Sequence, residues 1–410
     1  MGNQAIGAYA LGKGNAVVAR AEDPSANFFN PAALSFLESP MLGLGAEVLT
    51  PYNSHVDTAG NEEKAANHLF VIPNLFVGGP LGQTKWAWGV GLTSPFGLGT
   101  TWGANGFSKY MATDSKLHVL HANPNVAYKI NEGFSFAAGV DYMRADADLK
   151  RQVNVAAVNS QLPPYLAYDP TTPDGTFQQK GDGAGWGWNV AAFLKPKEGQ
   201  RLGLTYRSKI SMTIDGTAKL ENMSGTMATV FGGASYSTGG ESVLRFPDST
   251  TLGYSIDLNK KWNFEVDVEW TGWSTFKEQQ IHYTQETDAN RLAILNTGNP
   301  QQRQWKDVFS GALGTQYQLN ERWKLRSGFM YMDSPVPNKT YEPSIPDSDL
   351  YGIALGTGYK VGGVGVDLAY MANLFPSRTV NNTVGSPLSD ASGTYKSFAN
   401  SFALNFSYKF

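Results

Sequence analysis

The chain has 410 residues, of which 45 are Gly and none is Cys, and only 16% are charged. The lack of Cys excludes disulfide scaffolds, cysteine zinc sites and thiol nucleophiles. The 32 basic and 35 acidic residues give a net charge of −3, so no nucleic-acid footprint is visible. Mean hydropathy is negative and no run of about 18 apolar residues occurs, which excludes a helical membrane protein. Few charges and many aromatics, with no long apolar run, favour a β-protein whose apolar residues occupy alternate positions.

Residues 1–39 precede the first expected strand and have a different character. Asp23-Pro24-Ser25 and Asn30-Pro31-Ala32 are turn or helix-start signals, and they predict a short apolar helix around 32–36. A compact segment of this kind can fill a lumen as a plug or hang free as a tail. We therefore divide the chain into a hatch, 1–39, and a β-domain, 40–410.

Strict alternation marks the rest of the chain. At the C-terminus Phe402, Leu404 and Phe406 alternate with Ala403 and Asn405, which predicts a strand with one apolar face. The same pattern predicts fourteen strands. They are expected at 40–52, 65–80, 85–101, 115–130, 133–152, 182–196, 200–219, 243–259, 262–281, 304–319, 323–333, 348–361, 364–373 and 396–410.

The links between these strands alternate between short turns, such as Asn131-Glu132 and Gly362-Gly363, and long loops. Short turns at one end, long loops at the other and an even strand count are typical of bacterial outer-membrane barrels. A closed barrel also leaves no unpaired strand edge facing lipid. The sequence thus predicts an all-β, 14-stranded antiparallel transmembrane barrel with the N-terminus on the short-turn side. An array of soluble β-sandwiches is the alternative.

The third expected strand contains Pro95-Phe96-Gly97. Proline cannot donate a hydrogen bond to the ladder and glycine favours a bulge, so strand pairing should fail here. The failure opens the wall sideways, or it is only an ordinary bulge near the rim.

Several separate stretches resemble the FadL family, the outer-membrane transporters of long-chain fatty acids and their aromatic-hydrocarbon relatives. They are Leu11-Gly12-Lys13-Gly14, Asp23-Pro24-Ser25, Asn30-Pro31-Ala32-Ala33-Leu34, Leu92 to Leu98, Trp273 to Phe276, Asp333 to Pro337 with Ile345-Pro346-Asp347, and Tyr408-Lys409-Phe410. Together they span the chain from the hatch to the last strand.

The resemblance implies a monomeric barrel in the bacterial outer membrane, in contact with lipid and lipopolysaccharide. It implies a hydrophobic ligand, gating by Asn30, Pro31 and Ala32, and lateral release beside Pro95, Phe96 and Gly97. Two departures bear on the substrate. The N-terminus is shorter than in well-known members, and Leu350 stands where the fatty acid transporters tend to have a basic residue.

A ligand carboxylate would need an inward-facing basic residue, because an unpaired buried carboxylate is costly. We expect the candidates to be Arg144, Arg207, Arg245 and Lys306. The resemblance places Arg144 at the family's basic position late in strand five, although simple alternation turns it outward. For each residue the alternative is a lumen salt bridge with an inward acid such as Glu265, Asp267 or Glu269.

No catalytic, metal or cofactor site is expected. His118 and His121 are three apart on a strand and therefore lie on opposite faces. Gly12-Lys13-Gly14 lacks the preceding strand and the Lys-Ser/Thr ending of a phosphate loop.

The leading hypothesis is passive, ligand-gated uptake of long-chain fatty acids or similar molecules. Uptake of aromatic or alkane hydrocarbons, a general porin and an adhesive barrel are the alternatives. Gly2-Asn3-Gln4 follow Met1 without a signal-peptide pattern, so we expect the signal peptide to have been removed.

Overall fold

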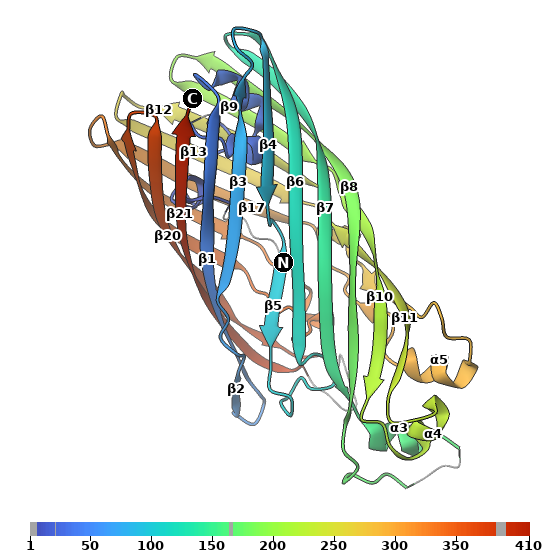
Figure 1. Ribbon diagram of the computed structural model, residues 1–410. Helices are drawn as coiled ribbons and strands as arrows, with labels where there is room; N and C mark the ends of the chain where they lie inside the picture. Colours follow the sequence, from blue (N-terminus) through green and yellow to red (C-terminus); the bar gives the residue numbers. More distant parts are fainter. Residues whose placement is uncertain (1–5, 21, 164–166, 383–390) are drawn as a thin grey trace.

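The computed structural model describes residues 6–20, 22–163, 167–382 and 391–410. These residues form a closed antiparallel barrel of fourteen spans (Figure 1). Ten spans are single strands and three are pairs of strands in line; the remaining span, which begins with β13, ends in short pieces. The strands are β1 (Met41–Val56), β2 (Glu62–Lys64), β3 (Phe70–Pro80), β4 (Trp86–Thr93), β5 (Gly97–Thr101), β6 (Asp114–Asn131), β7 (Phe134–Val153), β8 (Gly175–Lys197), β9 (Gln200–Arg207), β10 (Ile210–Glu221), β11 (Tyr236–Phe246), β12 (Ser249–Asp257), β13 (Trp262–Thr271), β14 (Glu278–Gln279), β15 (Ile281–His282), β16 (Gln301–Gln302), β17 (Val308–Gln318), β18 (Trp323–Met332), β19 (Leu350–Val361), β20 (Val364–Val380) and β21 (Gly393–Lys409).

The first and last spans close the barrel. β1 pairs with β21 over its whole length, from Met41 opposite Lys409 to Val56 opposite Thr394. The short turns lie together at one end with the C-terminus, and the long loops lie at the other end (Figure 1). Strand number, closure and the alternation of turns and loops confirm the sequence prediction. No helix in the described ranges is both long and apolar enough to cross a membrane.

The outward face carries the apolar residues, as alternation requires. On β7 the side chains of Phe136 and Val140 are exposed on the outside, whereas Ser135 and Asp141 are buried inside. Aromatic pairs mark both borders of the apolar band, which is the pattern of interfacial girdles. Near the short turns, Trp86 packs on Tyr128, Trp262 on Tyr317 and Trp323 on Tyr359, each with ring centroids 4.7 Å apart. Towards the loops, Tyr142 packs on Trp186 at 4.7 Å and Trp188 on Tyr206 at 5.2 Å.

Three expected strands are interrupted. The span expected at 85–101 breaks between Thr93 and Gly97, that at 200–219 breaks at 208–209, and that at 243–259 breaks at 247–248. Pro95 and Pro247 lie in two of these breaks. The ladder is interrupted there because proline lacks the N–H that donates to the neighbouring strand. The span expected at 262–281 leaves the ladder after Thr271, where a 3₁₀ turn, η2 (Trp273–Thr275), follows.

Helices from three loops cap one side of the outer end. They are α3 (Val155–Gln161), α4 (Gly225–Phe231) and α5 (Ala289–Leu295), and they share a core that includes Met223, Met227 and Phe231 (Figure 1). A further 3₁₀ turn, η3 (Asn338–Thr340), lies in the loop before β19.

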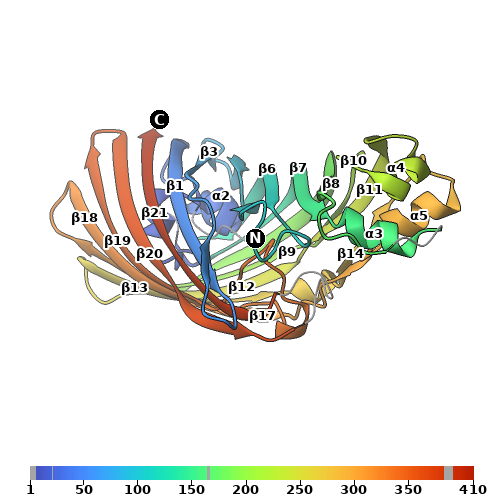
Figure 2. The same cartoon turned by 90° about the horizontal axis from the view of Figure 1, so that it is seen from below.

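The described part of the N-terminal segment lies inside the ring of strands (Figure 2). It forms α1 (Ala8–Leu11), α2 (Ala26–Phe29) and a 3₁₀ helix, η1 (Pro31–Phe36). The predicted helix at 32–36 is thus confirmed as a 3₁₀ helix. Alanines at inward positions of four neighbouring strands leave room for η1. They are Ala87, Ala127, Ala137 and Ala191. The boundary at residue 39 stays a prediction, and residues 1–5 lie outside the described part.

Candidate functional site

Two carboxylates on the inner face of β13 hold residues 13–19 of the hatch. Glu265 Oε2 lies 2.7 Å from Lys13 Nζ, and both side chains are fully buried. Glu265 Oε1 accepts from the N–H of Ala19 at 2.7 Å. Asp267 Oδ2 accepts from the N–H groups of Val17 and Val18 at 2.8 and 3.0 Å. These hydrogen bonds satisfy backbone donors that a plug without regular structure would leave unpaired.

The hatch also approaches the wall closely at β18. A methyl group added to Gly328 would lie 2.1 Å from the carbonyl carbon of Lys13, so only glycine fits there. Gly14, next along the hatch, has a φ of +60°, which also favours glycine.

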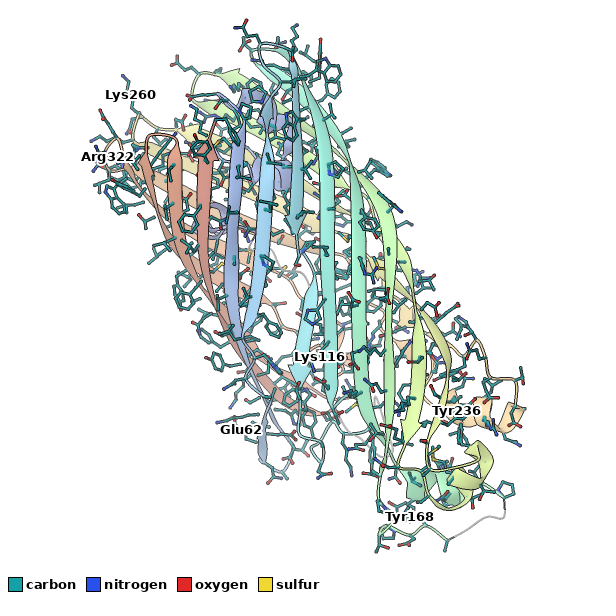
Figure 3. All side chains as sticks on the ribbon, in the orientation of Figure 1. Glu62, Lys116, Tyr168, Tyr236, Lys260 and Arg322 are labelled. Carbon is teal, nitrogen blue, oxygen red and sulfur yellow. The ribbon has the colours of Figure 1, made fainter. Side chains whose placement is uncertain are left out.

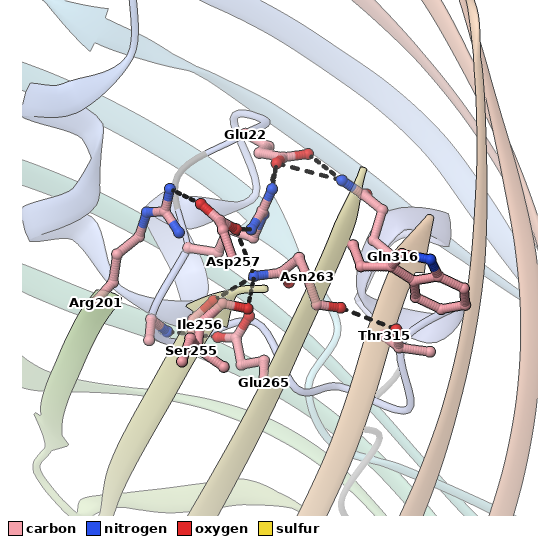
Figure 4. Close-up of polar contacts among 12 residues, drawn as sticks. Glu22, Arg201, Ser255, Ile256, Asp257, Asn263, Glu265, Thr315 and Gln316 are labelled. Atoms are coloured by element: carbon pink, nitrogen blue, oxygen red, sulfur yellow. Dashed lines mark hydrogen bonds and ion pairs between the residues drawn. The ribbon is translucent and has the colours of Figure 1, made fainter. Parts of the chain in front are cut away.

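A second set of ion pairs ties the hatch to the wall near the short turns (Figure 4). Arg20 lies 3.0 Å from Asp257, which also binds Arg201 at 2.7 Å. Glu22 binds Lys324 at 2.8 Å. The hatch is therefore anchored to β12, β13 and β18.

The Asn30-Pro31-Ala32 turn connects the hatch to another part of the wall. Asn30 Oδ1 accepts from the N–H of Ala32 at 3.1 Å and so caps η1. Its Nδ2 donates to the carbonyl groups of Val18 at 2.9 Å and Ala192 at 3.1 Å. One buried side chain thus joins two hatch segments to β8. These hydrogen bonds couple the position of η1 to that of Val18 and of β8.

A cavity of about 330 Å³ lies on the loop side of the hatch. Its lining mixes hatch aromatics, wall aliphatics and acids. Members include Phe28, Phe29, Pro31, Pro95, Phe96, Arg207, Phe246, Asp267, Glu269, Trp273, Trp305 and Leu350. We call it the lumen cavity. Residues expected to gate (Pro31) and to open the wall (Pro95, Phe96) therefore line one space, together with Leu350.

Arg207 is the one predicted basic residue that faces this cavity. It forms an ion pair with Asp141, and its Nη2 donates to the carbonyl of Phe28 in the hatch at 3.2 Å. Asp141 is completely buried and also binds His121 at 2.7 Å and Asn189 at 3.1 Å. Arg207 therefore forms a salt bridge in the lumen, which was the alternative to contact with a ligand carboxylate. Its acid partner is Asp141 rather than Glu265, Asp267 or Glu269. Because its charge is already compensated, Arg207 holds the hatch rather than offering a free cation.

The other three basic residues do not point into the lumen, contrary to the expectation for a ligand carboxylate contact. Arg144 points to the outer surface, half exposed, where it binds Asp182 at 2.9 Å. Arg245 is only half buried and lies between Leu244 and Phe246, which line the interior cavities, so alternation turns it outward.

Lys306 is exposed because the chain is irregular between Trp305 and Val308, which both face inward. Arg144 thus follows simple alternation rather than the position that the resemblance implies. For Arg245 the prediction fails because Leu244 and Phe246 were taken to face lipid, whereas they line the interior.

A second cavity, of about 110 Å³, lies nearer the outer loops and was not predicted. Most of its lining is apolar, from β6, β7, β8, β10, β11 and the loops; members include Leu117, Leu149, Phe177, Ile214, Phe276, Tyr283 and Ile345. We call it the outer cavity. Two arginines also line it. Arg303 is buried and paired with Glu342 at 3.0 Å, whereas Arg151 lies over the ring of Phe177 at 5.0 Å.

Arg151 differs from the other interior arginines in its ion pairing. Within residues 6–20, 22–163, 167–382 and 391–410 the structure records no acid paired with its guanidinium. Alternation along β7 predicts that Arg151 faces inward, because Met143 and Ala145 are buried inside and residue 151 is also odd-numbered on this strand. Alternation does not predict that Arg303 faces inward, because this residue lies in an irregular segment between β16 and β17.

A third cavity, of about 460 Å³, passes through the barrel wall. β3 pairs with β4 only from Leu75 to Pro80, and β5 pairs only with β6. The ladder between the third and second spans is therefore missing beside residues 70–74. The cavity at this place is lined by outward side chains of β3, such as Val71, and by inward side chains such as Met330 and Met371. We call it the wall window. Phe96 and Gly97 form part of its edge. Figure 3 shows Lys116 on the outer surface beside β5.

The histidines do not form a metal site. His118 is exposed on the outer face and His121 is buried on the inner face, which confirms that they lie on opposite sides of β6. In the described part of the chain no group of three or more His, Asp or Glu residues is arranged to hold a metal ion.

Comparison with known proteins agrees with this architecture. The profile of the family described as outer membrane protein transport protein (OMPP1/FadL/TodX) matches residues 4–410. The long-chain fatty acid transport protein of Escherichia coli O6:H1 is 28% identical over 403 residues, covering 93% of this chain and 87% of that protein.

Solved structures show the same fold. A Pseudomonas aeruginosa FadL homologue superposes with a TM-score of 0.86 at 21% identity, covering 99% of this chain and 98% of the other. The Pseudomonas putida toluene transporter TodX gives a TM-score of 0.77 at 21% identity, with 99% of both chains covered. Because the family profile covers almost the whole sequence, the chain is a bacterial outer-membrane transport protein and belongs to the OMPP1/FadL/TodX family.

Proposed function

We propose that this protein takes up long-chain fatty acids or similar hydrophobic molecules by passive, ligand-gated transport. In this proposal the ligand enters the outer cavity, moves to the lumen cavity, and leaves through the wall window into the bilayer after the hatch rearranges. The protein acts as a monomer surrounded by lipid and lipopolysaccharide.

The observation that carries the proposal is the wall window, because it connects an apolar interior with the lipid-facing surface. A chain of about sixteen methylenes costs roughly 13 kcal/mol to leave in water at about 0.8 kcal/mol per CH₂. A route that stays apolar from loops to bilayer avoids this cost, whereas an aqueous pore does not. The names of the relatives, a long-chain fatty acid transport protein and a toluene transporter, support hydrophobic cargo of both kinds.

Arg151 favours an acid over a neutral hydrocarbon. It lines the outer cavity, and no recorded ion pair among the described residues includes it, so a ligand carboxylate would gain a charge-assisted hydrogen bond there. Such a bond contributes about 1.5–3 kcal/mol, which is roughly a 10- to 150-fold change in affinity.

Uptake of a neutral aromatic or alkane is the second candidate. Two observations favour it: Leu350 lines the lumen cavity, and the cation there, Arg207, is already paired with Asp141.

Equilibrium binding of a labelled C16 fatty acid to the purified protein, with a long alkylbenzene as competitor, tests the proposal. We expect Arg151→Met to weaken fatty acid binding at least tenfold and to leave alkylbenzene binding within twofold. Arg144→Met is the matched control, since Arg144 lies on the same strand but outside the barrel. Equal losses for both ligands in Arg151→Met would refute carboxylate recognition. Displacement of the acid by alkylbenzene, with no effect of Arg151→Met, would favour the hydrocarbon. No binding of either ligand, together with steady ion conductance, would favour a porin.

A further inference from the structure

The wall window has a defined outline. At its outer end the N–H of Ala66 donates to the carbonyl of Thr101 at 2.8 Å, and His68 Nε2 lies 3.0 Å from Thr101 Oγ1. At its other end regular pairing begins again where Leu75 faces Leu92. Between these two closures β3 and β5 run without a ladder, and the unpaired edge of β3, residues 70–74, is about 17 Å long at about 3.3 Å per residue.

One side chain crosses this outline. Leu69 and Val71 are 64% and 61% exposed on the outer face of β3, so Phe70 between them points the other way. Its backbone is fixed by pairing with Leu49 of β1. Its ring reaches Gly99 on the opposite edge of the window: a methyl group added to Gly99 would lie 2.2 Å from Cζ of Phe70.

The ring therefore spans the window from edge to edge, and it fits only because residue 99 has no side chain. The ring contact recorded for it among the described residues is with His68, at 5.7 Å between centroids and a tilt of 40°. Rotation about its side-chain bonds would change the width of the window without breaking a hydrogen bond, because phenylalanine makes none.

We propose that Phe70 is the residue that sets the cross-section of ligands leaving through the wall window. Its ring leaves a passage that suits an unbranched alkyl chain and hinders branched or ring-bearing molecules. The partner in this function is Gly99, which provides the space for the ring. The proposal rests on the proposed function, because it assumes that ligands leave through the window.

The test compares uptake of two acids of equal chain length, hexadecanoic acid and a tetramethyl-branched hexadecanoic acid, into cells that produce each variant. In Phe70→Ala we expect the ratio of branched to unbranched uptake to rise about tenfold, the scale of discrimination that one apolar steric contact supplies. Phe70→Leu, which keeps part of the bulk, should give a smaller rise and serves if the alanine variant is poorly assembled. Equilibrium binding of both acids should stay unchanged, since Phe70 lines neither the lumen cavity nor the outer cavity.

A double-mutant cycle makes the test specific to the contact. Gly99→Ala should displace the ring and also change the ratio, but it should have no further effect in the Phe70→Ala background, because the clash is then absent. Gly133→Ala is the matched glycine control, since a methyl group there meets nothing closer than 3.4 Å. Phe136→Ala, on the lipid-facing side of β7, is the matched aromatic control.

Two outcomes separate this inference from the proposed function. If Gly97→Ile, which should close the window, blocks uptake of both acids while Phe70→Ala leaves their ratio unchanged, the inference on Phe70 is overturned and the wall exit stands. If Gly97→Ile leaves uptake of both acids unchanged, the wall exit itself fails. Slower migration of boiled than of unboiled samples on gels verifies that each variant forms a barrel.

Discussion

The buried pair between Lys13 and Glu265 makes a quantitative prediction about the hatch. Both side chains are fully buried, and their charged atoms lie 2.7 Å apart. Lys13→Met keeps the apolar stem but removes the cation, so among the described residues the buried Glu265 carboxylate keeps the N–H of Ala19 as its recorded donor. Breaking a buried pair in this way costs about 3–5 kcal/mol. The cost falls on the docked hatch, because the strand ladders of the barrel do not include Lys13.

At about 1.4 kcal/mol per tenfold, the fraction of molecules with a displaced hatch should rise by roughly 10²- to 10³-fold. Planar-bilayer recordings measure this directly: the parent protein should conduct almost no ions, and Lys13→Met should show frequent openings. Glu265→Gln in the Lys13→Met background keeps an oxygen for the Ala19 N–H but removes the stranded charge, so it should restore most of the closed state.

The matched control is Lys219→Met, which breaks the exposed pair with Glu221 at the outer rim. Exposed pairs contribute about 0–1 kcal/mol, so conductance should not change. The reasoning would be refuted if Lys13→Met formed an intact barrel that conducted no more than the parent protein, or if the second substitution failed to restore closure.

The other predictions concern the wall, the hatch turn and Asp347 in the loop before β19. Pro95→Val and Gly97→Ile should restore pairing of the third span and abolish uptake while ligand binding is kept; unchanged uptake in both variants would argue against the wall exit. Asn30→Ala removes hydrogen bonds to three segments, so it should slow uptake more than it weakens binding, and equal effects on the two would contradict a gating role. Burial raises the pKa of Asp347 above its ordinary value, so the folded protein holds this proton more tightly than the unfolded chain does, and the free energy of unfolding should fall as pH rises through the raised pKa. Asp347→Asn should therefore stabilise the protein against denaturant at pH 8 but not at pH 4, and a constant difference between these pH values would show that Asp347 titrates normally.

The sequence by itself determined the spans and their direction. Alternation along single strands such as β7 and β21 needs only local information, because side chains of a strand point to opposite faces with a period of two. The short turns, for example Gly362-Gly363, then determine which strand ends lie together. The turn signal at Asn30 predicted the 3₁₀ helix η1, whereas the helices α1 and α2 of the hatch were not predicted.

Where a span is broken, only the tertiary structure decided which of its side chains face the lumen and which face lipid. The inward and outward alternation of side chains continues along an unbroken strand but can change at a break. The predicted orientations of Arg245 and Lys306, which lie next to breaks, were therefore wrong. Alternation also treats an apolar residue as lipid-facing, although Phe246 is apolar because it lines the lumen. Arg151 shows the converse case. Alternation along unbroken β7 predicts that it faces inward, but only the tertiary structure shows that no recorded ion pair among the described residues includes it.

The window and its crossing ring were beyond the sequence for a different reason. Pro95 predicts a local failure of pairing, but the shape of the opening depends on how β3 separates from β5 and on the side chain that reaches across. The contact between Phe70 and Gly99 joins two spans through the space left by a missing ladder. The alternation of apolar and polar residues in the sequence does not predict such a contact, because the contact forms only when the closed barrel fixes the positions of both edges.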